Sequence, residues 1–210
     1  MKIVIFGANG KTGSLLIKQA LAKNYEVIAY VRKSGSIAND HPNLKIIVGD
    51  LNETLKLTDA IIGADACIST LGGSSITHRS PELVKGIENI VLSMEETNVK
   101  RFIYMSSIGA GDSKFLMAQP IRFIIVNLFL RVPLADHNIN EERIAASRLN
   151  WTIVRPGGLT DGPVTENLKH GTEKVLMKGN RSISRANVAS FILQQLTDET
   201  YSKKAVWLYE

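Results

Sequence analysis

Three evenly spaced glycines near the start of the chain form a pattern that could bind a phosphate. They lie in GANGKTG, residues 7–13, which follows the apolar run Lys2–Phe6 and opens a segment of helical periodicity, Lys11–Lys23. A glycine at a strand end permits a tight turn, a second lets backbone approach a pyrophosphate, and a third lets the helix pack closely. Free amides at a helix N-terminus favour an anion. The segment therefore predicts a dinucleotide-binding turn.

The glycine spacing is G-x-x-G-x-x-G, so the middle glycine is shifted from the usual G-x-G-x-x-G dinucleotide pattern. Gly10-Lys11-Thr12 also imitates the end of a P-loop, but a P-loop would need glycine where the chain has Ile5. We therefore exclude NTP hydrolysis on this turn. The simpler alternative is that the glycines are turn formers only, but the strand before them and the helix after them favour binding.

The end of the second apolar strand selects the dinucleotide. An acidic residue there would accept the ribose hydroxyls and repel a 2′-phosphate. The chain instead has Tyr30-Val31-Arg32-Lys33, with two cations and no acid. This favours NADP(H) over NAD(H), with Arg32 as the phosphate ligand. The alternative is that Arg32 and Lys33 are ordinary solvated charges.

Apolar, β-branched segments alternate with segments of helical periodicity along the chain. The predicted strands are Lys2–Phe6, Glu26–Val31, Leu44–Val48, Asp65–Ser69, Arg101–Met105, Trp151–Arg155 and Lys204–Leu208. The predicted helices are Lys11–Lys23, Thr54–Ile62, Pro81–Thr97, 114–131, Asp136–Leu149 and Arg185–Leu196, with Ser80 and Ser184 as N-caps. This alternation predicts an α/β fold with a Rossmann-type doubly wound parallel sheet. We expect one domain over 1–210, with residues 156–182 contributing to a small C-terminal substrate lobe.

Composition narrows the classes of function. The 210 residues include one cysteine, Cys67, which cannot form an internal disulfide, so we expect a cytoplasmic protein. The net charge of +5 comes from dispersed Lys and Arg without a basic run, which argues against nucleic acid. The longest apolar stretch, Ile121–Val132, is interrupted by polar residues and is too short for a membrane span. The four histidines lack metal-ligand spacing, and a monomer and a homodimer both remain open.

The chain resembles the atypical short-chain dehydrogenase/reductases, in the NAD(P)H-binding branch of NmrA-like proteins, biliverdin reductase B (flavin reductase) and bacterial NADH-flavin reductases. The resemblance covers nearly the whole chain. The motifs that carry it are IFGANGKTG (5–13), VRK (31–33), GDL (49–51), STLGG (69–73), YMSSIGAG (104–111), SRLNWTIVRPGGLTDGP (147–163) and SISRANVASFIL (182–193).

The resemblance implies a role for each matching position. The residues around the pyrophosphate would be Gly7, Asn9, Gly10, Lys11, Thr12 and Gly13, and Arg32 would meet the 2′-phosphate. Asp50 and Leu51 would line the adenine pocket, and Leu71 and Gly72 would run along the nicotinamide ribose. Those near the nicotinamide would be Ser106, Ser107, Pro156, Gly157 and Leu159.

One family feature is missing. The standard Tyr-x-x-x-Lys pair is expected at positions 133 and 137, where the chain has Pro133 and His137. This weakens alcohol–ketone chemistry but leaves hydride transfer to a planar acceptor, with solvent supplying the proton. Ser107 matches the family's catalytic serine and could donate to a substrate carbonyl, or it could simply close a strand. His137 could replace the lysine, or it could be an inert helix residue.

Two further expectations concern the same region. Asp136, Glu141 and Glu142 are interpreted as acids in the first turns of a helix, where they suit its dipole. Phe115–Leu134 carries several aromatic and apolar side chains and is interpreted as a lid for a small planar aromatic substrate, with core packing or a dimer face as alternatives.

Three functions are weighed on these grounds. The first is an NADPH-dependent reductase of a flavin, quinone or tetrapyrrole. The second is a non-catalytic NADP(H) sensor of NmrA type, which the missing Tyr/Lys pair favours. The third is a nucleotide-sugar epimerase, which the same missing tyrosine and the small C-terminal region weaken.

Overall fold

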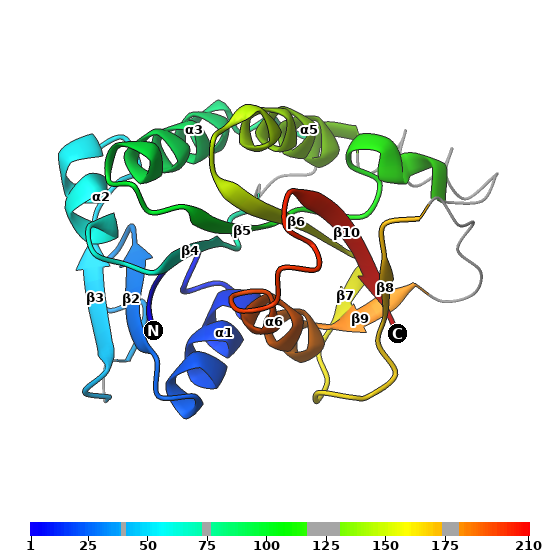
Figure 1. Ribbon diagram of the computed structural model, residues 1–210, viewed down its shortest axis with the longest axis horizontal. Helices are drawn as coiled ribbons and strands as arrows, with labels where there is room; N and C mark the ends of the chain where they lie inside the picture. Colours follow the sequence, from blue (N-terminus) through cyan, green and yellow to red (C-terminus); the bar gives the residue numbers. More distant parts are fainter. Residues whose placement is uncertain (39–40, 73–76, 117–130, 174–180) are drawn as a thin grey trace.

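A mostly parallel sheet runs through the centre of the protein (Figure 1). The computed structural model describes residues 1–38, 41–72, 77–116, 131–173 and 181–210. Within these ranges eight strands are ordered β3-β2-β1-β4-β5-β6-β10-β8, and only β8 is antiparallel to its neighbour. Their bounds are β1 Lys2–Phe6, β2 Glu26–Val31, β3 Leu44–Val48, β4 Ala66–Ser69, β5 Arg101–Met105, β6 Asn150–Pro156, β8 Lys169–Gly171 and β10 Lys204–Tyr209.

Helices cover both faces of this sheet (Figure 1). On one face lie α1 (Lys11–Ala22) and α6 (Arg185–Gln194); on the other lie α2 (Thr54–Ile61), α3 (Pro81–Glu96) and α5 (Arg131–Ala146). β1 shows why helices must pack on both faces of the sheet. Its Ile3 and Ile5 belong to the core on the first face, and its Val4 and Phe6 belong to the core on the second face. Strands apolar on both sides are typical of doubly wound parallel sheets, and the predicted fold class is confirmed.

The strand predictions hold closely, because continuous apolar runs between turn residues are strong signals. Three short strands were missed: β7 (Gly158–Thr160) and β9 (Ser182–Ser184), which pair with each other, and β8 in the main sheet. Each has three residues, too few for a recognisable period. They lie in and beside the segment predicted to form a substrate lobe, of which residues 174–180 are outside the described part.

The start of α5 was also predicted wrongly. The helix begins at Arg131 and not at Asp136, so Asp136 and Glu141 lie in its interior and not in its first turns. Both carboxylates are buried and engaged with cations, with Arg79 and Arg155 respectively. The helix dipole is therefore not what places them. The preceding segment was predicted as an irregular helix over 114–131. Its first residues belong to a 3₁₀ helix at Gly111–Leu116, and residues 117–130 are outside the described part.

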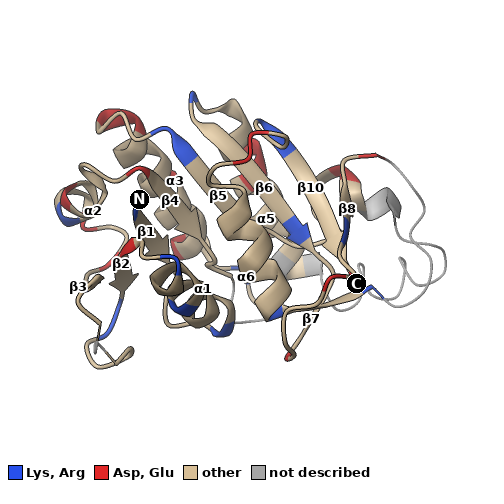
Figure 2. Ribbon diagram, turned by 60° about the horizontal axis from the view of Figure 1, so that its bottom comes forward, with Lys and Arg blue, Asp and Glu red and all other residues tan. Residues whose placement is uncertain are grey.

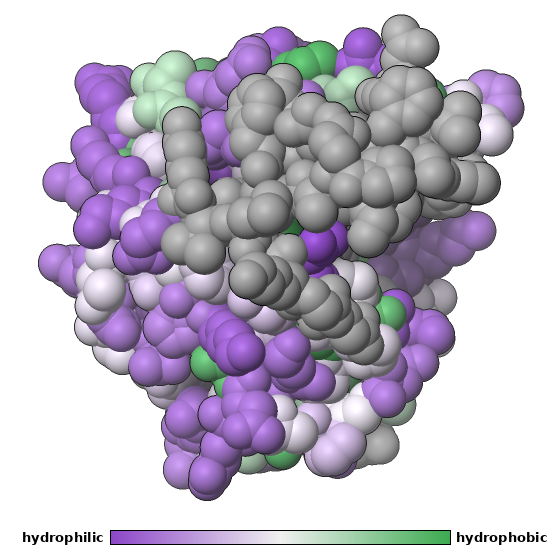
Figure 3. Space-filling view, turned by 90° about the vertical axis from the view of Figure 1, so that its right-hand side faces the viewer, coloured by the Kyte–Doolittle hydropathy of each residue, from purple (hydrophilic) through white to green (hydrophobic). Residues whose placement is uncertain are grey.

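Lys and Arg lie on several helices and strands of the described part and are interspersed with Asp and Glu (Figure 2). At the β8 end of the molecule, the described side chains that are in view are mainly hydrophilic (Figure 3). No helix in the described ranges is both long and apolar enough to cross a membrane.

The two predicted N-caps differ, and this gives a stability test. Ser184 Oγ accepts a hydrogen bond from Asn187 N at 3.1 Å, whereas Ser80 makes no side-chain cap bond at the start of α3. Losing a working cap costs about 1 kcal/mol. We expect Ser184→Ala to lower the free energy of unfolding by about that amount in urea denaturation, and Ser80→Ala to lower it by much less. Equal losses would show that the cap bond at Ser184 has no stabilising role.

Candidate functional site

The glycine turn between β1 and α1 is shaped by close backbone contacts. Gly7 has φ +78°, and a Cβ there would lie 2.9 Å from the Thr70 carbonyl carbon. Thr70 Oγ1 donates to the carbonyls of Phe6 and Gly7 at 3.3 and 3.2 Å, which ties the end of β4 to this turn. A Cβ on Gly13 would collide with the Gly7 carbonyl oxygen and with Ala8. Only glycine at both positions lets α1 start directly above the strand ends.

The N-terminus of α1 has no side-chain cap. Its N-cap is Gly10, in extended conformation and without a side chain to accept from the first amides, which have no intrahelical acceptor. Asn9 and Lys11 are exposed beside it, while Thr12 is buried. Uncapped amides together with the helix dipole form an anion site. The residues predicted to surround a pyrophosphate are therefore gathered around a helix end that fits one.

An acid lies next to this helix end. Asp161 Oδ2 is 3.4 Å from Lys11 Nζ, and its Oδ1 is 2.6 Å from Arg185 Nη1. These two cations hold the pKa of Asp161 below its ordinary range, Arg185 having the larger effect. The charge of Lys11 thus has a carboxylate partner close to the expected pyrophosphate.

A cleft of about 340 Å³ opens at the carboxyl ends of β1, β2, β3 and β4. This edge, where the strand order reverses direction on either side of β1, is where doubly wound sheets bind ligands. The structure brings seven of the predicted cofactor residues together in its lining: Gly7, Asn9, Arg32, Asp50, Leu51, Leu71 and Gly72. Sequence reasoning missed several others, namely Phe6, Tyr30, Asn52, Ser80, Glu82 and Leu83.

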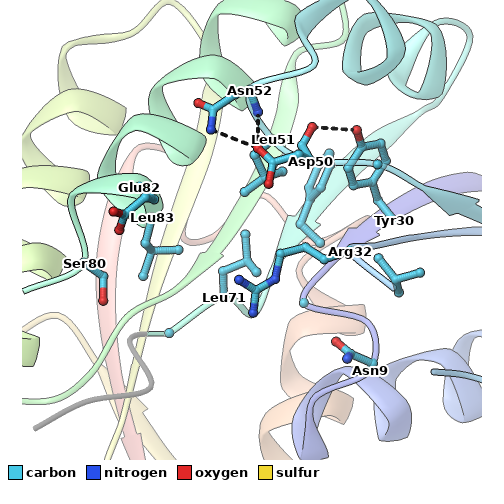
Figure 4. A pocket seen from close by; sticks show the side chains of 15 residues that line it. Asn9, Tyr30, Arg32, Asp50, Leu51, Asn52, Leu71, Ser80, Glu82 and Leu83 are labelled. Carbon is cyan, nitrogen blue, oxygen red and sulfur yellow. Dashed lines mark hydrogen bonds between the residues drawn. The ribbon is translucent and has the colours of Figure 1, made fainter. Parts of the chain in front are cut away.

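Arg32 extends from the end of β2 across the cleft toward Leu71 (Figure 4). Its guanidinium forms no hydrogen bond or ion pair with another residue of the described ranges, and the side chain is exposed. Lys33 follows it but does not line the cleft. Of the two cations seen in the sequence, only Arg32 is therefore positioned for a phosphate inside the cleft.

Asp50, Asn52 and Tyr30 form a bonded wall opposite the glycine turn (Figure 4). Asp50 Oδ1 accepts from Asn52 N and Nδ2, both at 2.9 Å, and the Tyr30 hydroxyl donates to the Asp50 carbonyl at 3.0 Å. Burial raises the pKa of Tyr30 to about 12, and the Glu53 and Asp50 carboxylates add to the rise. Tyr30 therefore stays a neutral donor that fixes the loop after β3.

The residues predicted near the nicotinamide lie farther along the same edge and are not part of this cleft lining. Ser106 is buried, and its hydroxyl donates to Glu141 Oε1 at 2.5 Å, which commits its only proton. Ser107 is partly exposed, and its hydroxyl makes a 3.2 Å bond to the Ile108 carbonyl. Ile108 N donates to the Pro156 carbonyl, which places Ser107 beside the end of β6.

Gly157 and Leu159 follow on that strand end. Gly157 is buried and has no room for a Cβ, because the Arg181 carbonyl packs against it. Leu159 is partly buried in β7, against the core of the α1 face. Both residues therefore help to shape the backbone at this edge of the sheet.

A buried ion pair braces the loop that carries Ser107. Arg155 Nη2 is 2.7 Å from Glu141 Oε2, both side chains being less than a tenth exposed, and Arg155 Nη1 is 2.6 Å from Asp112 Oδ1. Glu141 also accepts from Ser106, as described above. The network thus joins β6, α5, the 3₁₀ turn and the end of β5. Glu142, the neighbouring acid, is exposed.

His137 lies against β5. Its Nδ1 is 2.8 Å from the hydroxyl of Tyr104, and burial lowers its pKa, against the opposing effect of Glu141 and Asp136. Its ring is partly buried and is therefore not simply a solvated surface group. The predicted lid over Phe115–Leu134 lies largely on residues 117–130, outside the described part. The described ranges contain no cluster of His, Cys, Asp and Glu that could hold a metal ion.

This fold and cleft define a Rossmann-type dinucleotide-binding protein. The chain belongs to the NAD(P)H-binding family, whose sequence profile matches residues 7–199. It is 33% identical over 215 residues to an uncharacterized chloroplastic protein of Arabidopsis thaliana, covering 98% of this chain and 75% of that protein. The resemblance to atypical short-chain dehydrogenase/reductases is thereby confirmed.

Solved structures share the fold. One is ChuY, an anaerobillin reductase from Escherichia coli O157:H7, with a TM-score of 0.82, 22% identity and coverage of 100% of this chain and 97% of that one. Another is a short-chain dehydrogenase/reductase from Veillonella parvula DSM 2008 in complex with NADP, with a TM-score of 0.84, 20% identity and coverage of 100% and 94%.

Breaking the buried ion pair should destabilise the fold. Glu141→Gln leaves the Arg155 guanidinium with half its counter-charge, and losing one partner of a buried pair costs about 3 kcal/mol. We expect that loss in the free energy of unfolding from urea denaturation, and a change below about 0.5 kcal/mol for the exposed control Glu142→Gln. A small effect for Glu141→Gln would mean that the network does not brace this region.

Proposed function

We propose that the protein is an NADPH-dependent reductase that transfers hydride to a planar acceptor such as a flavin, quinone or tetrapyrrole. The observation that carries the proposal is the continuous carboxyl edge of the sheet. It runs from the uncapped helix end at Gly10, past Leu71, to the partly exposed hydroxyl of Ser107. At one end of this edge lies the helix terminus that fits the cofactor phosphates, and at the other lies the hydroxyl of Ser107.

The absence of a tyrosine–lysine pair at 133 and 137 narrows the chemistry. NADPH, when bound, supplies the hydride, so that NADPH, one proton and an oxidised acceptor give NADP⁺ and the reduced acceptor. Flavins, quinones and tetrapyrroles delocalise the incoming electron pair, so water can deliver the proton without a tyrosine relay. The protein's part is to orient the two rings and to polarise the acceptor through Ser107. A fold neighbour named as a reductase of a tetrapyrrole-type compound fits this class.

NADPH is proposed over NADH because of Arg32. Its guanidinium, which has no bonded partner among the described residues, faces the cleft from the end of β2, where the sequence has no acid to bind ribose hydroxyls. Arg32→Ala should weaken NADPH binding about tenfold, by the loss of a charge-assisted contact, and leave NADH binding nearly unchanged. Calorimetric titration of both cofactors measures this.

Lys33→Ala is the matched control, since it removes an adjacent cation that does not line the cleft. It should change the affinity for NADPH by much less than Arg32→Ala. Equal losses for the two cofactors in Arg32→Ala would remove the basis for choosing NADPH.

Ser107 is proposed to donate its hydroxyl proton to a carbonyl of the acceptor, in exchange for its 3.2 Å bond to the carbonyl of the adjacent Ile108. In Ser107→Ala we expect kcat to fall on the order of tenfold, the value of one hydrogen bond made in the transition state. The affinity for NADPH should stay within a factor of about two, and Ser107→Thr, which retains a hydroxyl, should recover part of the activity. Unchanged turnover in Ser107→Ala would exclude Ser107 from the reaction.

A non-catalytic NADP(H) sensor is the second candidate, because it would need the cofactor cradle but no proton relay. NADPH oxidation separates the two, followed at the nicotinamide band with FMN, a quinone and biliverdin offered in turn. Turnover well above the rate without protein supports the reductase. Tight NADPH binding with no turnover on any of the three would contradict it and favour the sensor.

A further inference from the structure

A chain of three polar side chains crosses the core between α5 and β5. Asn140 Nδ2 lies 3.0 Å from the Tyr104 hydroxyl, and that hydroxyl lies 2.8 Å from His137 Nδ1. Asn140 and Tyr104 are fully buried, and His137 is partly exposed. The predicted site included His137, but neither Tyr104 nor Asn140. These three hydrogen-bonded side chains therefore connect the interior of the fold to a candidate functional residue.

The chemistry of these groups sets the direction of the hydrogen bonds. The amide nitrogen of Asn140 can only donate, so the Tyr104 oxygen accepts from it and has its own proton left to give. Burial raises the pKa of Tyr104, so that proton stays on the phenol. His137 Nδ1 must then accept, which leaves the ring proton on Nε2. The bond pattern selects one of the two neutral forms of His137.

The charges around His137 are already balanced by other partners. On α5, Asp136 is bound to Arg79 Nε and Ser80 N, each at 2.8 Å. Glu141 is paired with Arg155 of β6, as described above. On β5 the facing group is the neutral phenol of Tyr104. Both carboxylates are therefore engaged with other partners, and burial lowers the pKa of His137 by more than Glu141 and Asp136 raise it.

His137 is linked to the cleft lining through its neighbour on α5. Its neighbour Asp136 holds Ser80, which lines the cleft, and Tyr104 precedes the partly exposed Ser107 by three residues. No residue of the described ranges bonds to Nε2, and Nε2 is not among the fully buried polar atoms that lack a partner. The ring thus has Nδ1 bonded in the core, and its Nε2 has no bonded partner among the described residues.

We propose that Tyr104 and Asn140 hold His137 as the neutral Nε2–H tautomer, so that His137 offers the acceptor substrate a hydrogen bond and does not transfer a proton. Tyr104 and Asn140 are positioning residues in this scheme. The assignment of a substrate to Nε2–H rests on the proposed reductase function, whereas the tautomer does not.

Nitrogen NMR tests the tautomer without any turnover. In protein labelled with ¹⁵N at histidine, long-range proton–nitrogen correlation should give His137 an unprotonated Nδ1 and a protonated Nε2 at neutral pH and one unit below it. Tyr104→Phe keeps the ring and removes the phenol proton, and it should move both nitrogen shifts toward a tautomer mixture. Circular dichroism matching wild type confirms that this variant folds. A protonated Nδ1, or an imidazolium at neutral pH, would overturn the proposal.

Substitution at His137 tests its role with the acceptor. The side-chain amide of His137→Gln can donate from the position of Nε2, whereas His137→Leu cannot donate. We expect the leucine variant to lose about tenfold in kcat and the glutamine variant to stay within about threefold of wild type, with a flat pH profile across the range of histidine titration. Equal loss in both variants, with activity that falls as pH rises through the histidine range only in wild type, would identify a general acid and overturn the proposal.

The two proposals fail in different ways. If no acceptor is reduced by wild-type protein, the reductase function fails and with it the substrate role of His137. The tautomer is then still decided by the nitrogen shifts of wild type and of Tyr104→Phe.

Discussion

The close approach of the ends of β1 and β4 and the start of α1 at Gly7 is the constraint on which the site depends. Gly7 lies against Thr70 at the end of β4, and Gly13 in the first turn of α1 lies against the Gly7 carbonyl. A side chain at either position would push α1 away from the sheet. The helix could then no longer direct its uncapped amides into the crevice at the point where the strand order reverses. The same two glycines therefore satisfy the requirements of helix packing and of ligand binding.

Polar contacts hold the loop after β5, which carries Ser107. Ser106 donates a hydrogen bond to Glu141, and Arg155 forms ion pairs with Glu141 and Asp112. Such a network is costly to bury unless every charge is paired, and here each charge has a partner. The network fixes the backbone on either side of Ser107 and therefore the position of that residue. In the proposed function, the glycine turn would position the cofactor, while this network would position the loop that carries Ser107.

The sequence allowed the sheet and half of the cleft to be predicted, for identifiable reasons. Apolar runs such as Leu44–Val48 and the glycine turn are local signals, and their structural consequences follow from local chemistry. Ser80, Glu82 and Leu83 reach the cleft from the start of α3, about ten residues beyond Leu71, and no local pattern connects them to it. Such contacts appear only when the chain is folded.

The polar interior was the least predictable part. Asp136 and Glu141 look like solvated helix acids because Arg79 and Arg155, which bury them, are distant in sequence. His137 was selected by its position relative to a family motif, but its bond to Tyr104 could not be inferred without the register of α5 on β5. The missing signal in each case is the tertiary partner of a charged or polar side chain.

We propose that NADPH lies along the cleft at the carboxyl ends of β1 to β4. Titration of ¹⁵N-labelled protein with NADPH, followed by amide proton–nitrogen correlation, tests this placement. We expect the largest shift changes on residues 7–13, 32, 49–52 and 71–72, above all on the amides at the start of α1. Absence of changes there, or changes centred on another part of the surface, would contradict it.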